Sequence, residues 1–354
     1  MSFDLESLIR ENIRRLKPYS SARSEFAGEA EVFLDANENA FGSPAGVGYN
    51  RYPDPLQKEL KGRVAELCGV DPSQIFVGNG SDEAIDLLFR IFCEPGRDDC
   101  IVCPPTYGMY CVSADINDVV VSEFPLSSEF QLDVPAILSG VTPATKLIFI
   151  CSPNNPTGNL MERRDVISMA EKFRGIVVID EAYIHFAASE SFITELTQLP
   201  NVVVLQTFSK AWGMAGLRVG LAFASAEIIA LMNRVKPPYN VSAIAQRAVL
   251  EAIERRGEIQ RWISETINER NRLIAALKRF DFVETIYPSD ANFVLVRVSD
   301  AHALYRYLVM EKIVVRDRSN VEHCEGCVRI TIGTVEENNR LISALERFIQ
   351  GRDI

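Results

Sequence analysis

The sequence predicts an α/β protein whose larger part is a mostly parallel sheet flanked by helices, joined to a smaller α+β part. Three observations lead to this prediction. Short apolar strands alternate with amphipathic helices through the middle of the 354-residue chain, a long helical stretch follows, and the rest is a pattern of short strands and two helices. Alternation of strands and helices is typical of a parallel sheet with helices on both faces, and such sheets bind ligands at the carboxyl ends of their strands.

The predicted strands of the larger part are apolar runs rich in β-branched residues. The run Asn201-Val-Val-Val-Leu205 is one example, with the length and composition of a buried strand. By the same pattern we expect strands at residues 75–78, 100–103, 146–151, 176–180, 201–205 and 217–223. Helices are expected at residues 81–93, from residue 106 onward, at 162–173 and at 243–280.

The smaller part is predicted mainly from the C-terminal region. Strands are expected at residues 282–286, 292–298, 313–316 and 328–332, with helices that begin at Ala301 and Val335. A helix at residues 5–16 and the segment 31–34 are expected to pack with this part. We therefore predict a large domain at residues 45–275 and a small domain formed by both termini, residues 1–44 and 276–354.

Composition and charge exclude several classes of protein. Hydrophobic residues make up 47% of the chain and charged residues 24%, which is the balance of a globular protein. The formal net charge of −11 argues against binding to nucleic acid or to an anionic membrane surface. No apolar run is long enough to span a bilayer, and the first residues lack the basic start and apolar core of a signal peptide. We expect a cytoplasmic protein.

Eight cysteines raise the question of a metal site. Cys100 and Cys103, and also Cys324 and Cys327, have the Cys-x-x-Cys spacing of zinc ligands, and His323 lies beside the second pair. The first pair, however, belongs to a predicted buried strand, where cysteine behaves as a small apolar residue. We predict reduced thiols and no metal.

Lys210 follows a predicted buried strand, with Ser209 before it and Arg218 eight residues after it. A lysine in this position can form a Schiff base with an aldehyde cofactor, and desolvation can lower its pKa to suit that work. A serine hydroxyl and an arginine can together bind a phosphate. The combination suggests pyridoxal phosphate (PLP). The alternative is a core strand and a glycine-rich turn with an incidental lysine.

A second candidate for phosphate binding is the sequence Gly-Asn-Gly-Ser-Asp-Glu at residues 78–83, between a predicted strand and a predicted helix. Glycines let the backbone approach an anion closely, and a helix N-terminus offers free N–H groups with a partial positive charge. The alternative is an ordinary helix N-cap at Ser81 or Asp82. Together with Ser209 and Arg218, this segment is expected to contact one phosphate.

Further polar and aromatic residues stand at predicted strand ends. Asp180 ends the strand 176–180, where a buried carboxylate needs a partner, and a protonated pyridine ring would be one. Asn155 and Tyr183 could both reach the 3′ oxygen of the cofactor, and Tyr107 could stack on its ring. Each residue also has an ordinary explanation: an aspartate that caps a turn, a turn rich in proline and asparagine, or an aromatic residue in the core.

Taken together, these motifs resemble those of the fold-type-I PLP-dependent aminotransferases, and within that group the histidinol-phosphate aminotransferases. The resemblance covers nearly the whole chain and implies the PLP-transferase fold, with a seven-stranded sheet in the large domain. One departure is Ala40, where the family commonly has proline on a loop. The matching segments are residues 34–39, 51–55, 78–83, 104–110, 152–158, 180–183, 207–220, 236–240 and 329–333.

The resemblance implies roles for the residues around the cofactor ring. Lys210 would be the Schiff-base lysine, and Asp180 would be the partner of the pyridine nitrogen. Asn155 and Tyr183 would bind the 3′ oxygen, and Tyr107 would stack on the ring. Lys210, Asp180 and Tyr183 are the predicted catalytic residues.

The resemblance also implies how the cofactor phosphate is bound, and by how many chains. Tyr52 matches a tyrosine that reaches the phosphate of the neighbouring subunit, so the active site would be shared across a homodimer. Within one chain, the phosphate would be bound by Gly80, Ser81, Asp82, Ser209 and Arg218.

The reaction implied by the resemblance belongs to histidine biosynthesis. It is the reversible transfer of an amino group between L-histidinol phosphate and 2-oxoglutarate, which gives imidazole-acetol phosphate and L-glutamate. Such an enzyme binds two unlike anions in turn, and planar guanidinium groups suit both. Arg329 and Arg316 match substrate arginines of the family, and Tyr19 and Asn37 match pocket positions. Arg316 could instead form a surface salt bridge, and Tyr19 could instead pack within a mobile arm.

Three other functions are compatible with parts of this pattern. An aromatic amino-acid aminotransferase would have the same cofactor site and different substrate residues. A PLP-dependent decarboxylase of phosphothreonine would share the fold and an anion site. A regulatory protein built on the PLP fold would need a DNA-binding module, for which the acidic chain leaves little room before residue 34.

Overall fold

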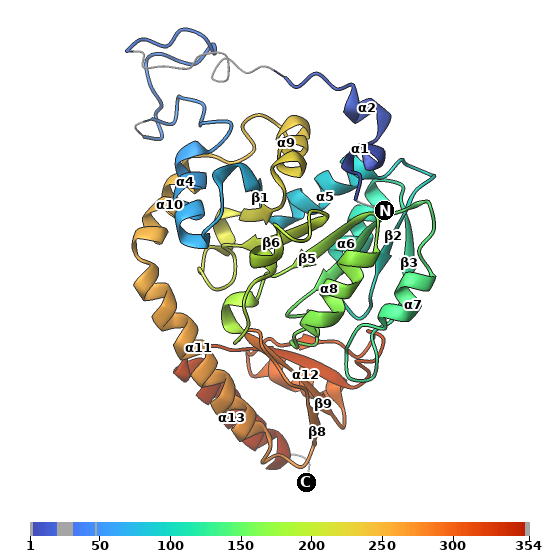
Figure 1. Cartoon of the computed structure of the whole chain (residues 1–354). Coiled ribbons are helices and arrows are strands. Elements are labelled where there is room, and N and C mark those ends of the chain that lie inside the picture. The colour runs from blue at the N-terminus through green and yellow to red at the C-terminus, as the bar shows by residue number, and fades with distance from the viewer. Residues whose placement is uncertain (1–2, 20–30, 47, 351–354) are drawn as a thin grey trace.

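The computed structural model describes residues 3–19, 31–46 and 48–350. Two sheets organise these residues, and Figure 1 shows the larger one above the smaller one. The larger sheet has seven strands in the order β1-β7-β6-β5-β4-β2-β3, and the smaller has four in the order β10-β11-β9-β8. The predicted α/β class and the seven-stranded sheet are confirmed.

The large sheet is parallel except at one strand, β7, which runs antiparallel to β1 and β6. One of its strands, β3, was not predicted from the sequence, because its apolar run is short and its residues are largely exposed at the sheet edge. The strands are β1 Ile75–Asn79, β2 Asp99–Val102, β3 Val120–Glu123, β4 Thr145–Cys151, β5 Ile176–Asp180, β6 Val202–Thr207 and β7 Val219–Phe223.

Helices cover both faces of the large sheet and enclose a separate core on each. On β5, Ile176 and Val178 point into one core, while Val177 and Ile179 point into the other, as the two-residue period of a strand requires. The first core lies under α5 Ser81–Phe92, α6 Met109–Ile116 and α9 Ala226–Val235. The second lies under α4 Lys58–Cys68, α7 Val134–Ser139, α8 Arg163–Lys172 and α10 Ala243–Glu254. Short 3₁₀ helices occur at Pro72–Gln74, Ile184–Phe186, Phe192–Glu195 and Ala215–Leu217.

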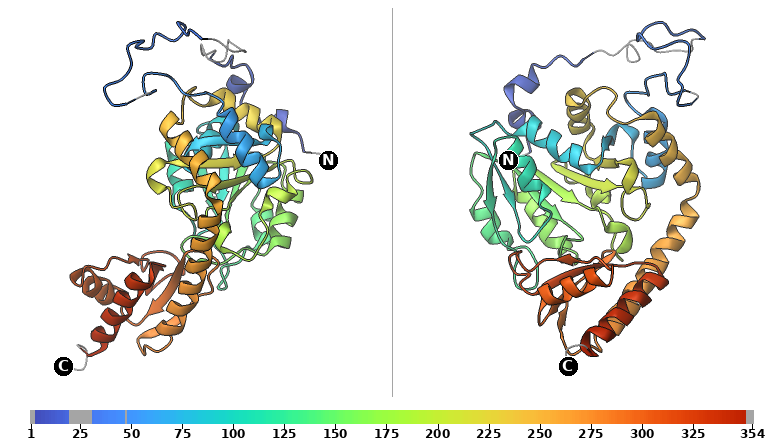
Figure 2. Two further views of the ribbon diagram at one scale, coloured as in Figure 1. Left: turned by 90° about the vertical axis from the view of Figure 1, so that its left-hand side faces the viewer. Right: turned by 180° about the vertical axis from the view of Figure 1, so that it is seen from behind.

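The smaller sheet is antiparallel throughout and packs against two helices. A third helix, α11 (Arg256–Leu277), runs from one part of the molecule to the other (Figure 2), with Ile259 in a core of the large sheet and Leu273 in the core of the small one. The single helix expected at residues 243–280 is thus two helices. The remaining elements are β8 Val283–Ile286, β9 Phe293–Val298, β10 Arg316–Asp317, β11 Cys327–Thr331, α12 Ala301–Met310 and α13 Val335–Gln350.

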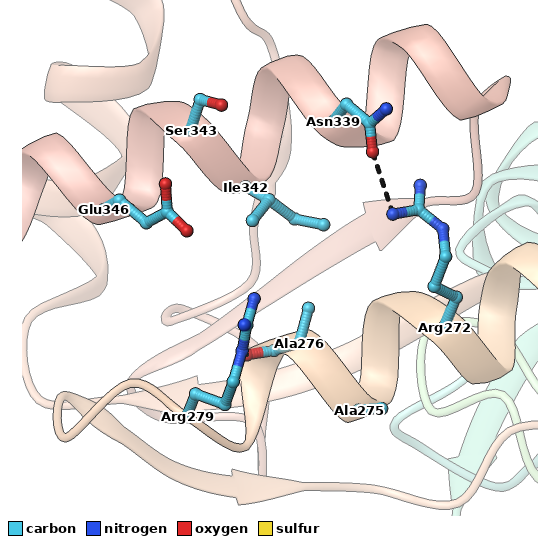
Figure 3. A pocket seen from close by; sticks show the side chains of 8 residues that line it. All are labelled: Arg272, Ala275, Ala276, Arg279, Asn339, Ile342, Ser343 and Glu346. Atoms are coloured by element: carbon cyan, nitrogen blue, oxygen red, sulfur yellow. Dashed lines mark hydrogen bonds between the residues drawn. The ribbon is translucent and has the colours of Figure 1, made fainter.

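Helices α11 and α13 pack side by side and leave a shallow groove of about 510 Å³ between them (Figure 3). Ala276 and Ile342 provide its apolar floor, and the guanidinium of Arg272 donates a hydrogen bond to Oδ1 of Asn339 at 2.8 Å. Arg279 also lines the groove, where its Nε contacts the carbonyl oxygen of Ala276 at 3.4 Å. The hydrogen bond between Arg272 and Asn339 joins the two helices, and the groove lies away from the strand ends of the large sheet.

The N-terminal helices α1 (Leu5–Leu8) and α2 (Glu11–Arg14) lie on the large part of the molecule (Figure 1). Ile9 and Ile13 are buried in the core under α5, and the backbone N–H of Arg10 donates to the carbonyl of Ile91 at 3.0 Å. The prediction that this helical segment packs with the small part is therefore wrong, because its apolar residues Ile9 and Ile13 pack against α5 instead. The domain limits at residues 45 and 275 remain a prediction.

No helix within the described ranges combines the length and the apolar character needed to cross a membrane.

Candidate active site

A cleft of about 660 Å³ opens at the carboxyl ends of the parallel strands, between the two sheets. Its walls come from the loops after β2, β4, β5 and β6, from the start of α5 and from the β10–β11 pair. The cleft brings together these residues of the predicted site: Ser81, Asp82, Tyr107, Asn155, Asp180, Tyr183, Ser209, Lys210, Arg218, Arg316 and Arg329.

Lys210 stands three residues beyond the end of β6, and its side chain is exposed to the cleft. Its Nζ lies 5.6 Å from the centre of the Tyr183 ring. The pKa of Lys210 is lowered, first by desolvation in the cleft and then by the positive charge of Arg329, while Asp180 acts in the opposite direction. A larger share of neutral amine follows, which is the form that attacks a carbonyl carbon.

Asp180 ends β5 and is buried at the floor of the cleft. Its Oδ2 accepts a hydrogen bond from the hydroxyl of Tyr110 at 2.8 Å, and its Oδ1 accepts one from the backbone N–H of Ala182 at 3.1 Å. Burial raises the pKa of Asp180 to about 6, although both hydrogen bonds act to lower it. A buried carboxylate in this state gains free energy from a cationic N–H partner.

An anion site is formed by the N-terminus of α5 and two side chains. Gly80 caps the helix with φ of 79°, and a Cβ at this position would lie 2.7 Å from a terminal nitrogen of Arg218. Arg218 has φ of 55°, a strained left-handed conformation, and its guanidinium lies 3.5 Å from the Ser209 hydroxyl and 3.3 Å from a carboxylate oxygen of Asp82. The free backbone N–H groups at the start of α5 and the guanidinium of Arg218 therefore lie together, where both can bind an anion.

Asn155 and Tyr183 lie together on the opposite wall. The Asn155 amide donates to the Tyr183 hydroxyl at 3.4 Å, and its Oδ1 accepts a hydrogen bond from Arg329. Burial raises the pKa of Tyr183, so its hydroxyl stays protonated and can donate. Tyr107 lies edge-on to Tyr110, with its hydroxyl 3.1 Å from Asp82.

Two predicted substrate residues come from the small sheet. Arg316 and Arg329 are direct partners in the antiparallel β10–β11 pair, so their side chains leave the same face of the sheet. Both line the cleft. Burial is the largest cause of a lowered pKa for Arg329, whose guanidinium also lies 5.1 Å from the ring centre of Phe293.

Three predicted side chains do not line the cleft of this chain, and Gly80 borders it beside Arg218. Tyr52 stacks on Tyr239 with ring centres 4.4 Å apart, and half of its surface is exposed. Tyr19 is 76% exposed, and Asn37 is also exposed. The roles of these three residues remain predictions.

Two residues of the cleft region were not predicted from the sequence. Tyr110, which donates to Asp180, is fully buried three residues after Tyr107. Arg318 lines the cleft two residues after Arg316, the spacing that places side chains on the same face of a strand. This spacing from Arg316 could have identified Arg318 as a candidate cleft residue from the sequence.

All eight cysteines are free thiols, and Cys100 is buried in β2 as a core residue. Within the described residues, no group of three or more His, Cys, Asp or Glu side chains is placed to bind a metal ion.

Comparison with known proteins places the chain in a family. The family model of aminotransferases of class I and II matches residues 26–345. The histidinol-phosphate aminotransferase of Parabacteroides distasonis is 53% identical over 343 residues, which are 97% of this chain and 98% of that protein. The enzyme of the same name from Cytophaga hutchinsonii is 52% identical over 348 residues, 98% of this chain and 100% of that protein.

A solved structure shares the fold. The histidinol-phosphate aminotransferase of Sinorhizobium meliloti, in complex with pyridoxal-5′-phosphate, superimposes with a TM-score of 0.80 at 24% identity, covering 89% of this chain and 90% of that one. The chain belongs to the class I and II aminotransferases, in the histidinol-phosphate aminotransferase family.

Proposed function

We propose that this protein transfers an amino group between L-histidinol phosphate and 2-oxoglutarate with PLP as its cofactor, giving imidazole-acetol phosphate and L-glutamate in histidine biosynthesis. One observation carries this proposal. A single cleft contains a lysine with a lowered pKa, a buried carboxylate, an anion site at one end and, at the other, arginines that have no acidic partner among the residues that the structure describes. The high identity to histidinol-phosphate aminotransferases supports the choice of substrate.

The residues of the cleft fit PLP. Asp180 is a buried carboxylate with a raised pKa that faces the cleft, and it suits the protonated nitrogen of the ring. Gly80 leaves room beside Arg218 that any side chain would fill, at the start of a 12-residue helix. Ser209, Arg218 and the N–H groups of the helix start would bind the phosphate.

When bound, PLP supplies a ring that withdraws electrons from the reacting carbon of the substrate. Lys210 would hold the cofactor between turnovers. Its Nζ, once free, would act as the base that takes the proton from the substrate carbon and as the acid that gives it back on the cofactor side. The lowered pKa of Lys210 suits both directions, because an amine that titrates nearer to neutral pH exchanges protons more readily.

The surrounding residues orient the ring and maintain its charge. The Asp180 carboxylate would accept the ring N–H, and the Tyr110 hydroxyl restricts the rotation of that carboxylate. Tyr183 and Asn155 would donate hydrogen bonds to the 3′ oxygen. Tyr107 would pack against the ring.

Arg316 and Arg329 bind the anionic groups of the two substrates in turn. Glutamate and 2-oxoglutarate each carry two carboxylates, and histidinol phosphate carries a phosphate and no α-carboxylate. Arg329 is held in place by Asn155 and the Phe293 ring, whereas Arg316 is exposed and can adjust to ligands of different length. A guanidinium group offers paired donors to either anion.

A homodimer with shared active sites is part of the same proposal. Exposed apolar and aromatic side chains gather on the segment that extends from the body of the molecule (Figure 1), and such a surface suits a second copy of the chain. This segment would carry Asn37 and Tyr52 to the neighbouring cleft. The exposed side chains are Val32, Leu34, Phe41, Tyr49, Tyr52 and Leu56. A cytoplasmic location also belongs to this proposal.

The substrate is tested by turnover assays of the PLP-loaded protein with three compounds: histidinol phosphate, phenylalanine and phosphothreonine. We expect transamination of histidinol phosphate with 2-oxoglutarate to dominate. Negligible turnover of histidinol phosphate, with activity on either other compound, would contradict the proposed substrate and leave the cofactor assignment intact.

The assembly is tested by light scattering coupled to gel filtration. The expected mass is about twice the 39.5 kDa of the chain. A single-chain mass for a fully active protein would contradict the shared active site.

A further inference from the structure

Three guanidinium groups, and not two, leave one face of the β10–β11 pair. Arg316 lies opposite Arg329 in the ladder, and the backbone N–H of Arg318 continues that ladder with a 2.9 Å hydrogen bond to the carbonyl of Cys327. Asp317, between the two arginines of β10, turns to the other side, where its carboxylate lies 2.6 Å from Nδ1 of His302 on α12. The alternation of the strand therefore directs Arg316 and Arg318 into the cleft together.

These guanidinium groups have no acidic partner within the described residues. Arg329 donates to the neutral amide of Asn155, and Nε of the half-buried Arg318 has no hydrogen-bond partner. The pKa of Arg318 is lowered by burial and next by the charges of Arg329 and Arg316. A structural arginine gains free energy from a carboxylate, whereas Arg318 is repelled by its neighbours. A bound anion would offset this repulsion.

The geometry distinguishes between the two anions that the proposed function requires. A carboxylate has two oxygens in a plane and one negative charge. A phosphate ester has three terminal oxygens in a tetrahedral arrangement and carries between one and two negative charges at neutral pH. Two arginines can satisfy a carboxylate, and a third finds a free acceptor only on the phosphate.

We propose that Arg318 is a specificity-determining residue that contacts the substrate phosphate and favours it over a carboxylate. This inference rests on the proposed function, because it assigns a role within the same cleft. Arg318 would engage when histidinol phosphate enters and would lack an anionic partner when 2-oxoglutarate is bound.

The test compares Arg318→Gln with Arg279→Gln, a matched control. Arg279 belongs to the groove between α11 and α13, so its substitution removes the same charge outside the cleft (Figure 3). The measured quantity is the ratio of kcat/KM for histidinol phosphate to kcat/KM for histidinol, which lacks the phosphate. We expect this ratio to fall about 10- to 100-fold in Arg318→Gln, the effect of losing a hydrogen bond to a charged group, and to stay unchanged in Arg279→Gln.

Three further measurements extend the test. The half-reaction with 2-oxoglutarate should change less than about 3-fold in Arg318→Gln, and an equal loss on both sides would overturn the proposal. Arg318→Lys keeps the charge without the paired donors, so an intermediate loss is expected there. If Arg318→Gln does not fold, Arg318→Lys takes its place. An unchanged ratio of the two kcat/KM values in Arg318→Lys would then overturn the proposal.

Thermal unfolding of a folded Arg318→Gln protein should show no loss of stability, and a clear loss would overturn the proposal in favour of a structural role.

Inorganic phosphate separates failure of this inference from failure of the proposed function. As a competitor of 2-oxoglutarate in the PLP-loaded protein, phosphate should inhibit Arg318→Gln about 10-fold more weakly than the wild type. That result would support phosphate recognition by Arg318 even if the wild type did not turn over histidinol phosphate. Equal inhibition of the two proteins would overturn it.

Discussion

The two ends of the cleft differ in whether their charged side chains have partners within the protein. At the cofactor end, Asp180 accepts hydrogen bonds from Tyr110 and Ala182, and Arg218 is paired with Asp82. At the substrate end, Arg316 and Arg318 have no acidic partner within the described residues. The cofactor end is therefore already organised by hydrogen bonds and an ion pair, whereas Arg316 and Arg318 at the substrate end are paired with no described carboxylate.

This difference follows from how long each ligand stays. A cofactor that remains through many cycles benefits from residues that are already oriented, because each avoided rearrangement adds to affinity. Two substrates that alternate in one site must each leave, so protein carboxylates that compete for the arginines would slow binding or weaken it. The contrast predicts that substitutions of Lys210 and Asp180 at the cofactor end lower the rate of the reaction, whereas substitutions of the arginines at the substrate end change selectivity.

Lys210→Ala should have the largest effect. Removal of the amine eliminates both the covalent attachment of the cofactor and the proton transfer, so transamination should fall by about 10⁴-fold or more. The visible absorbance of the lysine-bound cofactor should disappear with it, as measured by spectroscopy of the purified protein. Lys278→Ala, at an exposed lysine beyond the end of α11, is the control and should change neither property. Retained turnover in Lys210→Ala would contradict the assigned role.

Asp180→Asn should reduce kcat by about 10²- to 10³-fold, because a neutral amide no longer stabilises the protonated ring. The fold should remain intact, since the amide oxygen can still accept the hydrogen bond from Tyr110. Steady-state kinetics with saturating PLP measure the effect. A loss that appears only at limiting PLP and is absent at saturating PLP would show that Asp180 contributes only to cofactor affinity.

The same substitution has a pH-dependent effect on the stability of the cofactor-free protein. The pKa of Asp180 is raised from 3.8 to about 6 by burial, so the folded protein binds its proton more tightly than the unfolded chain does. The stability of the wild type therefore falls as pH rises from about 4 to above 6. Asp180→Asn escapes this loss and should be more stable than the wild type at pH 8, by on the order of 2 kcal/mol. Urea unfolding at pH 8 and pH 5 checks this, and a gap that does not shrink at pH 5 would contradict it.

Much of the cofactor end could be predicted from the sequence because of sheet topology. Asp180 and Lys210 follow recognisable buried strands, and parallel neighbouring strands end at one edge, so residues at those ends meet. The hydrogen bond from Tyr110 to Asp180 could not be predicted in this way. It spans 70 residues and depends on how helix α6 is rotated against the sheet.

The substrate end and the N-terminal segment were harder to predict. Arg318 lies beyond the two residues assigned to β10, so its two-residue spacing from Arg316 indicates a shared face only if the strand continues, and the hydrogen bond from Arg318 to Cys327 shows that it does. Ile9 and Ile13 form an apolar stripe that predicts burial, but a stripe does not name its partner, and the helix packs on α5.

Arg316→Ala should change selectivity more than rate. We expect the KM for histidinol phosphate to rise about 10- to 100-fold and the KM for 2-oxoglutarate to rise less, because the phosphate depends on more guanidinium contacts. Separate measurement of the two half-reactions gives both constants, with Arg279→Ala as the control. Equal rises in the two constants would mean that Arg316 does not select the phosphate.

Tyr52→Phe should have the smallest effect, and it tests whether the cofactor end is completed by a second chain. The ring of Tyr52 stacks on Tyr239, and phenylalanine keeps that stacking, so the variant removes only the hydroxyl. This hydroxyl does not line the cleft of its own chain, so any effect on the cofactor must reach a neighbouring cleft. The affinity for PLP should fall about 10-fold, as expected for one hydrogen bond to a charged group, while Tyr239→Phe should leave it unchanged. Equal PLP affinities for all three proteins, measured by titration of the cofactor-free forms, would mean that each chain completes its own phosphate site.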